Sequence, residues 1–243
     1  MTRTGATKPK RLAGRIALIT GASRGIGAAI AKAYAAEGAR LILTGRTPGA
    51  LEEVDDAVRA AGAEPATLVP FDLADLDKID ALAAEIAKRH GKLDILVGNA
   101  GILGSLTPIA QIEPKMWNEV LTVNLTACQR LIHAFDPLLR QSDAGRAIFV
   151  TSAVGQEVRA YWSAYAVSKA ALDMMVRIYA AETVKTRIRA NLVNPGGTRT
   201  AMRANAFPGE DPLTLRTPDD IAPVFVDLAL PECTRHGEIV RAQ

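Results

Sequence analysis

The chain has 243 residues, of which 49% are hydrophobic and only 5% aromatic, and its formal net charge is +3. That length is enough for one sizeable domain and short for two, and the small charge gives no reason to expect nucleic acid binding. No apolar run approaches the roughly 20 residues that span a bilayer. With few aromatic residues, Ala, Leu, Val and Ile must build the core, a mixture suited to helices packed on a parallel sheet.

The amino-terminal segment is basic, with charges at Arg3, Lys8, Lys10 and Arg11. No apolar run follows these charges, so the segment lacks the pattern of a secretory signal. We expect residues 1–11 to form a flexible basic tail and residues 12–243 to form a single domain.

Cysteine and histidine usage bounds the redox compartment and the metal chemistry. Two cysteines, Cys128 and Cys233, do not suggest a disulfide framework and fit a reducing cytoplasm. The histidines are scattered without ligand spacing, at His90, His133 and His236. We therefore expect a cytoplasmic protein with no catalytic metal.

Strand and helix patterns alternate along the chain. Short apolar runs predict seven strands, at 16–20, 40–44, 67–70, 95–98, 147–151, 189–193 and 238–240. Helical stretches lie between them, at 25–37, 48–61, 75–90, 113–140, 161–186 and 218–230. This alternation predicts an α/β fold: a doubly wound, Rossmann-type parallel seven-stranded sheet with helices on both faces.

Residues 202–217 break the helical pattern because they carry Pro208, Gly209 and Pro212. We expect an irregular insertion on the substrate side of the domain. Long insertions near a site often act as lids.

A glycine-rich turn follows the first predicted strand and opens an alanine-rich helix. Gly21 lets the chain turn tightly, Gly25 lets backbone approach a pyrophosphate, and Gly27 lets the helix pack on the strand, so the helix N-terminus faces the anion. The spacing is G-x-x-x-G-x-G rather than the commoner G-x-G-x-x-G. A purely structural turn is the alternative.

Tyr165 and Lys169 are four residues apart, which places both side chains on one face of a helix. A lysine ammonium beside a phenol favours the phenolate and lowers the phenol pKa from its usual value of about 10. Ser152 follows an apolar strand, and parallel-sheet sites lie beyond the carboxyl ends of strands. The three groups together predict proton transfer at an alcohol oxygen. The alternatives are an exposed lysine, a packing tyrosine and a serine that caps a helix.

From about Leu12 onward the chain resembles the short-chain dehydrogenase/reductase family. The motifs that carry the resemblance stand in the expected order: Thr20–Gly27, Asp72–Leu73, Gly98–Gly101, Val123–Asn124, Thr151–Ser152, Tyr165 with Lys169, and Asn194–Gly196. The resemblance implies an NAD(P)(H)-dependent enzyme that interconverts a carbonyl and an alcohol, with Tyr165 as general acid and base. The stretch 194–203 also resembles a bacterial subgroup with poorly defined substrates.

The resemblance implies a catalytic set of Asn124, Ser152, Tyr165 and Lys169. Lys169 hydrogen-bonds the nicotinamide ribose and lowers the tyrosine's pKa. Asn124, a poor residue for a helix interior, holds a water that links Lys169 to solvent; a locally bent helix is the alternative. Where this chain has Gly98, the family more often has Asn.

The implied cofactor-binding set spans the chain. Asp72 and Leu73 bound the adenine, Asn99 steadies the central sheet, and Thr198 and Thr200 bond the carboxamide. The full set is Gly21, Ser23, Arg24, Gly25, Ile26, Gly27, Arg46, Asp72, Leu73, Asn99, Ala100, Gly101, Tyr165, Lys169, Pro195, Gly196, Thr198 and Thr200.

The end of the second strand bears on cofactor choice. NAD-binding relatives place an acidic residue there to bond the ribose 2′-hydroxyl, whereas this chain has Gly45 followed by Arg46. Arg24 in the glycine turn adds a second guanidinium, and planar guanidinium donors match a 2′-phosphate. We predict NADP(H) in preference to NAD(H); the alternative is that both arginines are surface charges.

The substrate is expected to be a small-molecule carbonyl or alcohol. The predicted pocket wall includes Leu103, Val154, Gln156, Tyr161, Trp162 and the insertion at 202–217. Trp162 and Val154 suggest an apolar or aromatic group. Arg159 either attracts an acidic substrate or is a solvated surface residue.

Two other functions are open on the sequence. One is a nucleotide-binding sensor or scaffold without turnover, whose usual mark is loss of the tyrosine or lysine. The other is an epimerase or dehydratase on the same scaffold, although such relatives tend to be longer. By resemblance we also expect a homodimer or homotetramer that pairs through the helices at 113–140 and 161–186, unless those faces are covered within one subunit.

Overall fold

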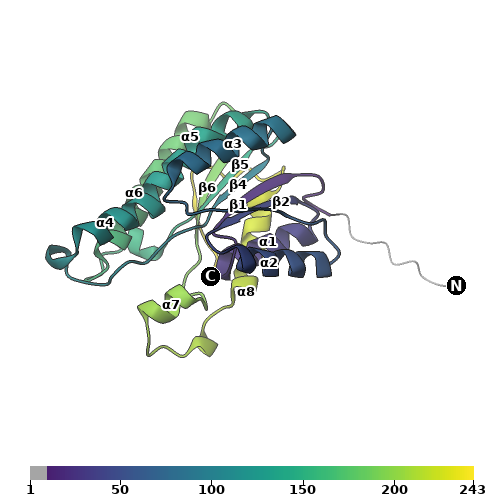
Figure 1. The fold of residues 1–243 in the computed structure, drawn as a ribbon. Coiled ribbons are helices and arrows are strands. Elements are labelled where there is room, and N and C mark those ends of the chain that lie inside the picture. Colours follow the sequence, from purple (N-terminus) through teal and green to yellow (C-terminus); the bar gives the residue numbers. More distant parts are fainter. Residues whose placement is uncertain (1–9) are drawn as a thin grey trace.

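A computed structural model describes residues 10–243, and residues 1–9, most of the predicted tail, lie outside the described residues (Figure 1). Seven parallel strands form one sheet in the order β3-β2-β1-β4-β5-β6-β7. The strand order reverses between β1 and β4, and this confirms the predicted doubly wound fold. The strands are β1 Ile16–Thr20, β2 Arg40–Gly45, β3 Thr67–Pro70, β4 Ile95–Gly98, β5 Arg146–Val150, β6 Arg189–Asn194 and β7 Ile239–Arg241.

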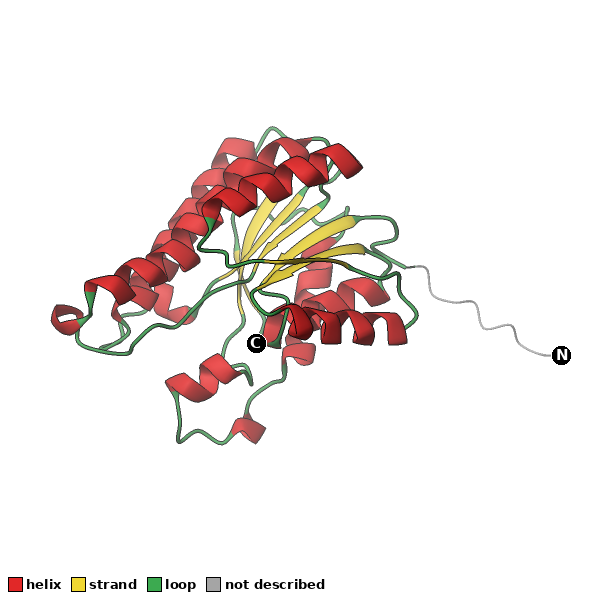
Figure 2. Cartoon of the chain, viewed as in Figure 1, coloured by secondary structure: helices red, strands yellow, loops and turns green. Residues whose placement is uncertain are grey.

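Helices cover both faces of the sheet (Figure 2). Helices α1, α2 and α8 lie on one face, and α3, α5 and α6 lie on the other (Figure 1). The helices are α1 Gly25–Ala36, α2 Pro48–Ala60, α3 Leu76–His90, α4 Pro114–Leu121, α5 Ala127–Arg140, α6 Ser163–Thr183, α7 Ala201–Ala206 and α8 Pro218–Ala229. No described helix combines the length and the apolar character that a bilayer crossing needs.

Alternation along each strand divides the core into two layers. In β1, Ala17 and Ile19 pack with α1 and α8, while Ile16 and Leu18 pack on the opposite face with α3 and α5. Successive strand side chains point to opposite faces, so a strand buried on both faces reads as a continuous apolar run. This is why the strands were predicted to within one residue at each end.

The single helix predicted at 113–140 was wrong, because a π-helical turn at Thr122–Thr126 separates α4 from α5. Such wider turns are often found at functional sites. Asn124 lies in this turn and its side chain is fully buried. The turn brings the Asn124 amide inward to the loop after β4, where it bonds the backbone of Ile102.

The predicted helix at 161–186 begins two residues later and ends three residues earlier, at Ser163 and Thr183. Tyr161 has φ 73°, a left-handed conformation that the helix cannot include. The predicted irregular insertion at 202–217 was also partly wrong. It opens with α7, whose Thr200 cap accepts a bond from the Arg203 N–H, and it contains a 3₁₀ turn at Pro212–Thr214.

The described chain is tied down from Arg11, within the segment predicted as a tail. The Arg11 guanidinium pairs with Glu37 at 2.8 Å and with Asp227 at 3.1 Å. The next residue, Leu12, is fully buried in the α1 and α8 layer.

Candidate active site

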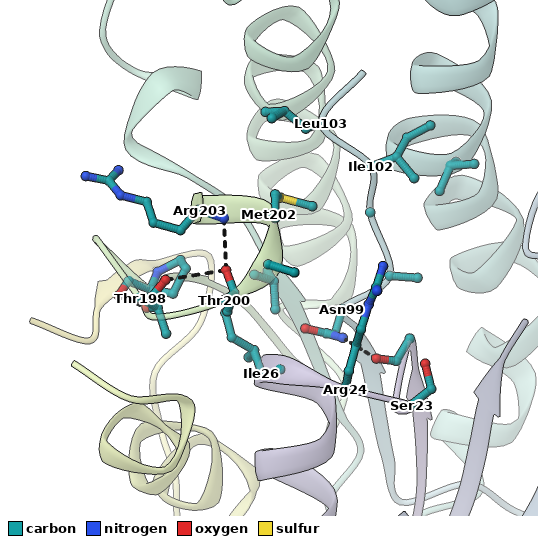
Figure 3. A pocket seen from close by; sticks show the side chains of 18 of the residues that line it. Ser23, Arg24, Ile26, Asn99, Ile102, Leu103, Thr198, Thr200, Met202 and Arg203 are labelled. Atoms are coloured by element: carbon teal, nitrogen blue, oxygen red, sulfur yellow. Dashed lines mark hydrogen bonds between the residues drawn. The ribbon is translucent and has the colours of Figure 1, made fainter. Parts of the chain in front are cut away.

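A cavity of about 920 Å³ opens at the carboxyl ends of the strands and brings together most of the predicted site residues. Side chains from the turn after β1, from residues 99–103 and from residues 198–203 converge on it (Figure 3). The predicted residues on its wall are Gly21, Ser23, Arg24, Gly25, Ile26, Arg46, Asp72, Leu73, Asn99, Ala100, Gly101, Leu103, Ser152, Trp162, Tyr165, Lys169, Pro195, Gly196, Thr198 and Thr200. Gly27, Asn124 and Val154 are not among its lining residues.

Two glycines of the turn after β1 are required by close contacts. Gly21 has φ +64°, and a Cβ there would lie 2.8 Å from Ala100 Cα. A Cβ at Gly27 would lie 2.3 Å from the Gly21 carbonyl oxygen. Side chains at either position would therefore push the turn, the helix and the loop after β4 apart. Gly27 acts in packing behind the cavity wall rather than on the wall.

Hydrogen bonds lock this turn to the loop after β4. The Thr20 hydroxyl accepts from the backbone N–H of Asn99 at 3.0 Å and of Ala100 at 3.1 Å. The Asn99 amide donates to the carbonyls of Thr20 and Gly21. Within α1, the first turn carries no acidic residue and Arg24 provides no side-chain cap. The positive end of the α1 dipole therefore faces the cavity without an internal anion, which suits a phosphate.

The end of β2 has room for little more than glycine. A Cβ at Gly45 would lie 3.3 Å from both Ser23 side-chain atoms and from Leu51. Arg46 follows it, and its guanidinium lies 4.0 Å from the Asp72 carboxylate, with both side chains more than half exposed. An exposed pair at that distance is weak, so Arg46 is available to an anion at the cavity wall.

Tyr165, Lys169 and Ser152 meet where α6 crosses the end of β5. Tyr165 is 8% and Lys169 is 4% exposed, and the Ser152 hydroxyl is near enough to the phenol to lower its pKa. The Lys169 ammonium donates to the Val150 carbonyl at 2.8 Å and lies 5.8 Å from the centre of the Tyr165 ring. The predicted trio is thus assembled on one wall of the cavity.

The predicted direction of the Tyr165 pKa was wrong for the protein by itself. Burial raises the pKa of this phenol, and the nearby Ser152 hydroxyl only partly opposes the increase. In the free protein the Lys169 ammonium donates to the Val150 carbonyl and does not reverse the increase. Burial likewise lowers the pKa of Lys169, against the opposing influence of Cys128 and Asp173.

Asn124 has a partner set that the sequence did not show. Its Oδ1 accepts from the Ile102 N–H at 2.8 Å, and its Nδ2 donates to the Ile102 carbonyl and to the Ser168 hydroxyl. The amide therefore ties the loop after β4 to α6 next to Lys169. Its side chain is not bent back on its own helix.

An aromatic cluster around Trp162 forms one side of the cavity. Its ring meets the Tyr165 ring edge-on at 5.9 Å and the Phe207 ring at 5.6 Å. Sequence reasoning did not single out Ile102, which also lines this side, whereas the predicted insertion at 202–217 contributes Met202, Arg203 and Ala206. The sequence also carried a signal for the short helix that holds Met202, Arg203 and Ala206, because Thr200 is a favoured N-cap residue.

Part of the predicted substrate wall does not face the cavity. Val154 is buried in the 3₁₀ turn Ala153–Gly155, and Tyr161 is 62% exposed. Neither residue lines the cavity, and Gln156 does not line it either. Val154 lies within a 3₁₀ turn that follows Ser152, and the Gln156 amide donates to Asp173 instead of lining the cavity. Among residues 10–243, no three His, Cys, Asp or Glu side chains gather in a way that could hold a metal ion.

A doubly wound sheet whose cleft joins a glycine turn to a buried tyrosine, a buried lysine and a half-buried serine is typical of a dinucleotide-binding α/β oxidoreductase. The sequence model of the short chain dehydrogenase family matches residues 15–211, and the chain belongs to that family. It is 44% identical to an uncharacterized oxidoreductase, YciK, of Escherichia coli K12, over 87% of this chain and 84% of that protein.

Solved structures agree with this assignment. A short chain dehydrogenase from Pseudomonas syringae has a TM-score of 0.94 and 41% identity, covering 98% of each chain. A short chain dehydrogenase from Escherichia coli CFT073, complexed with NADPH, has a TM-score of 0.92 and 41% identity, covering 98% of this chain and all of its own. These three similar proteins are bacterial, and their names state no substrate.

Proposed function

We propose that this chain is an NADP(H)-dependent oxidoreductase that reversibly reduces a carbonyl to an alcohol, with Tyr165 as general acid and base. One observation carries the proposal: Tyr165, Lys169 and Ser152 line the same cleft as the glycine turn after β1. A phenol and a second hydroxyl in one cleft can bind a single substrate oxygen.

The residues present fit a nicotinamide dinucleotide. Gly21 and Gly27 allow the tight turn after β1, where a Cβ would collide with backbone, and the N-terminus of α1 opens onto the cavity beside this turn. The absence of a side chain at Gly45, with Arg24 and Arg46 on the same cavity wall, supports NADP(H) over NAD(H). The similar Escherichia coli CFT073 structure is complexed with NADPH, which supports the same choice.

When bound, the dinucleotide supplies the hydride that the carbonyl carbon accepts. The chain's own part is proton transfer and orientation. Ser152 and Tyr165 donate hydrogen bonds to the carbonyl oxygen, and Tyr165 gives up its phenolic proton as that oxygen becomes an alcohol. Because burial raises the pKa of Tyr165, the free protein keeps this phenol protonated at neutral pH, as an acid requires.

Lys169 has two roles in the proposal. Its positive charge stabilises the phenolate left after proton transfer, and its bond to Val150 fixes the ammonium close to the Tyr165 ring. Asn124 is proposed to hold the water that returns a proton through Lys169. Since the Asn124 side chain is occupied by Ile102 and Ser168, such a water would be held by its main chain.

The test is NADPH consumption with a panel of ketones and aldehydes, for the native protein and for Tyr165→Phe. We expect the variant to bind NADPH as tightly as the native protein and to lose turnover by at least about a hundredfold. Native rates in the variant would show that Tyr165 is not the acid. Binding of NADPH with no turnover of any carbonyl would favour a sensor instead.

We also propose that two copies pair through α5 and α6. Val167, Met174 and Ile178 lie on one face of α6 and are 41%, 58% and 51% exposed. An apolar stripe of this kind is typical of a covered interface. Light scattering of the double variant Met174→Glu, Ile178→Glu should report a smaller particle than the native protein; an unchanged particle size would exclude this face as the interface.

Both cysteines are unpaired, which supports the proposed cytoplasmic location.

A further inference from the structure

Asp173 is a buried carboxylate that the proposed reaction does not use. It lies on α6 one turn beyond Lys169 and is only 6% exposed. The Thr151 hydroxyl donates to its Oδ1, and the Gln156 amide donates to its Oδ2 at 3.3 Å. Burying a carboxylate is costly unless it is paired and hydrogen-bonded, so these contacts account for its presence but leave open what they hold in place.

The partners of Asp173 bracket Ser152. Thr151 immediately precedes Ser152, and Gln156 ends the 3₁₀ turn that follows it. Both residues are therefore attached to the helix that carries Tyr165, from the two sides of Ser152.

The same helix touches this segment at two further points. Lys169 donates to the carbonyl of Val150, the last residue of β5. At Gly155, a Cβ would lie 2.9 Å from the carbonyl carbon of Lys169, so the turn packs directly on the α6 backbone. Only the Asp173 contacts are made by a side chain that the proposed chemistry leaves free.

We propose that Asp173, through Thr151, is a positioning residue that holds the Ser152 hydroxyl against the Tyr165 phenol. This inference rests on the proposed function, because it assigns Asp173 a role in the same site. A hydroxyl that must meet both a phenol and a substrate oxygen needs its backbone held within about 0.5 Å.

The charges around Asp173 are consistent with this role. Lys169 and Arg177 flank it on α6, one turn to either side, and Cys128 reaches Lys169 from α5. Burial raises the pKa of Asp173, while Thr151, Gln156 and the two cations oppose the increase. Hydrogen bonds and neighbouring charges therefore both stabilise the Asp173 carboxylate, and a test of the positioning role has to separate the two effects.

Thr151 offers a pair of variants that separates the hydroxyl from the shape. Thr151→Val keeps the shape of the buried side chain and removes the bond to Asp173, whereas Thr151→Ser keeps the hydroxyl. With NADPH and a carbonyl substrate, we expect Thr151→Val to lose about tenfold to a hundredfold in kcat/KM, since small misplacements of reacting groups cost up to about a hundredfold. Thr151→Ser should stay near the native value, and NADPH affinity should not change in either.

Two further variants complete the set. Asp173→Ala should behave like Thr151→Val, and if it does not fold, Thr151→Val carries the test alone. Glu157→Gln removes an exposed carboxylate just beyond the same turn and should leave kcat/KM unchanged. In a Ser152→Ala background, Thr151→Val should have no further effect, because a residue that acts through Ser152 has nothing left to position.

A spectroscopic measurement makes the test independent of turnover. In protein labelled with ¹³C at the tyrosine ζ-carbon, the Tyr165 signal, assigned with Tyr165→Phe, should shift in the same direction in Thr151→Val and Ser152→Ala, and stay in place in Thr151→Ser. An unmoved signal in Thr151→Val, or an undiminished loss in the Ser152→Ala background, overturns the inference. If the native protein reduces no carbonyl, the proposed function fails, and the signal still decides the positioning role.

Discussion

Gly98→Ala tests a packing constraint that is specific to this chain. Gly98 ends β4, and a Cβ there would lie 2.3 Å from Cδ1 and 2.6 Å from Cε1 of Phe149 in the neighbouring strand β5. Ordinary carbon contacts are about 3.5–4.0 Å, so the ring would have to move by more than about 1 Å. Because Phe149 is fully buried, the ring has little room to move.

Overpacking of this kind typically costs about 1–3 kcal/mol. For a chain of this size, each kcal/mol shifts the melting temperature by about 2–4 °C. We therefore expect Gly98→Ala to lower the melting temperature by about 2–12 °C, measured by calorimetry or circular dichroism.

Two companion variants sharpen the measurement. Gly49→Ala, in the first turn of α2, has open space around its Cβ and should raise stability by about 0.5–1 kcal/mol. Phe149→Leu removes the ring, so Gly98→Ala should cost clearly less in that background than in the native protein. Equal costs in the two backgrounds, or a Gly98→Ala protein that melts with the native one, would refute the clash.

Three other outcomes are expected. The double variant Arg24→Ala, Arg46→Ala should lose about tenfold to a hundredfold in NADPH affinity and little in NADH affinity, measured by fluorescence titration; equal losses would contradict the NADP(H) assignment. Glu210→Gln breaks the two-point contact with Arg203, at 2.6 and 2.5 Å, and should raise KM for the carbonyl at unchanged NADPH affinity; an unchanged KM would count against α7 as a substrate wall. Burial lowers the pKa of His236 below its usual value of about 6.5, so the unfolded chain binds the proton more readily. The stability that the neutral ring contributes is present above about pH 6.5 and is lost as pH falls toward the folded pKa. Between about pH 8 and 5, the free energy of unfolding, measured with denaturant, should therefore fall more steeply for the native protein than for His236→Asn. Parallel curves for the two proteins would exclude this contribution.

The acid–base behaviour of the site follows from opposing influences on Tyr165. Burial raises its pKa, and the nearby Ser152 hydroxyl opposes part of the increase. In the proposed reaction the phenol must release its proton only when the substrate oxygen gains negative charge. A phenol that stays protonated until then, beside a buried cation that stabilises its anion, suits a reversible reaction.

The local sequence determined the fold of this protein. Strands buried on both faces read as continuous apolar runs, and the spacing of Gly21, Gly25 and Gly27 predicted the turn after β1. The four-residue spacing of Tyr165 and Lys169 on a helix is likewise a local property. These signals depend on neighbours along the chain, which is why they could be interpreted without coordinates.

The tertiary structure alone decided how the groups of the site act on one another. The direction of the Tyr165 pKa depends on burial and on where the Lys169 ammonium points. The π-helical turn at Asn124 depends on Ile102, and Gly98 depends on a ring in the next strand. The positioning role proposed for Asp173 depends on the hydrogen bond that it accepts from the Thr151 hydroxyl. Each of these is a contact between segments distant in sequence, and neither periodicity nor spacing encodes which distant side chain fills a given space.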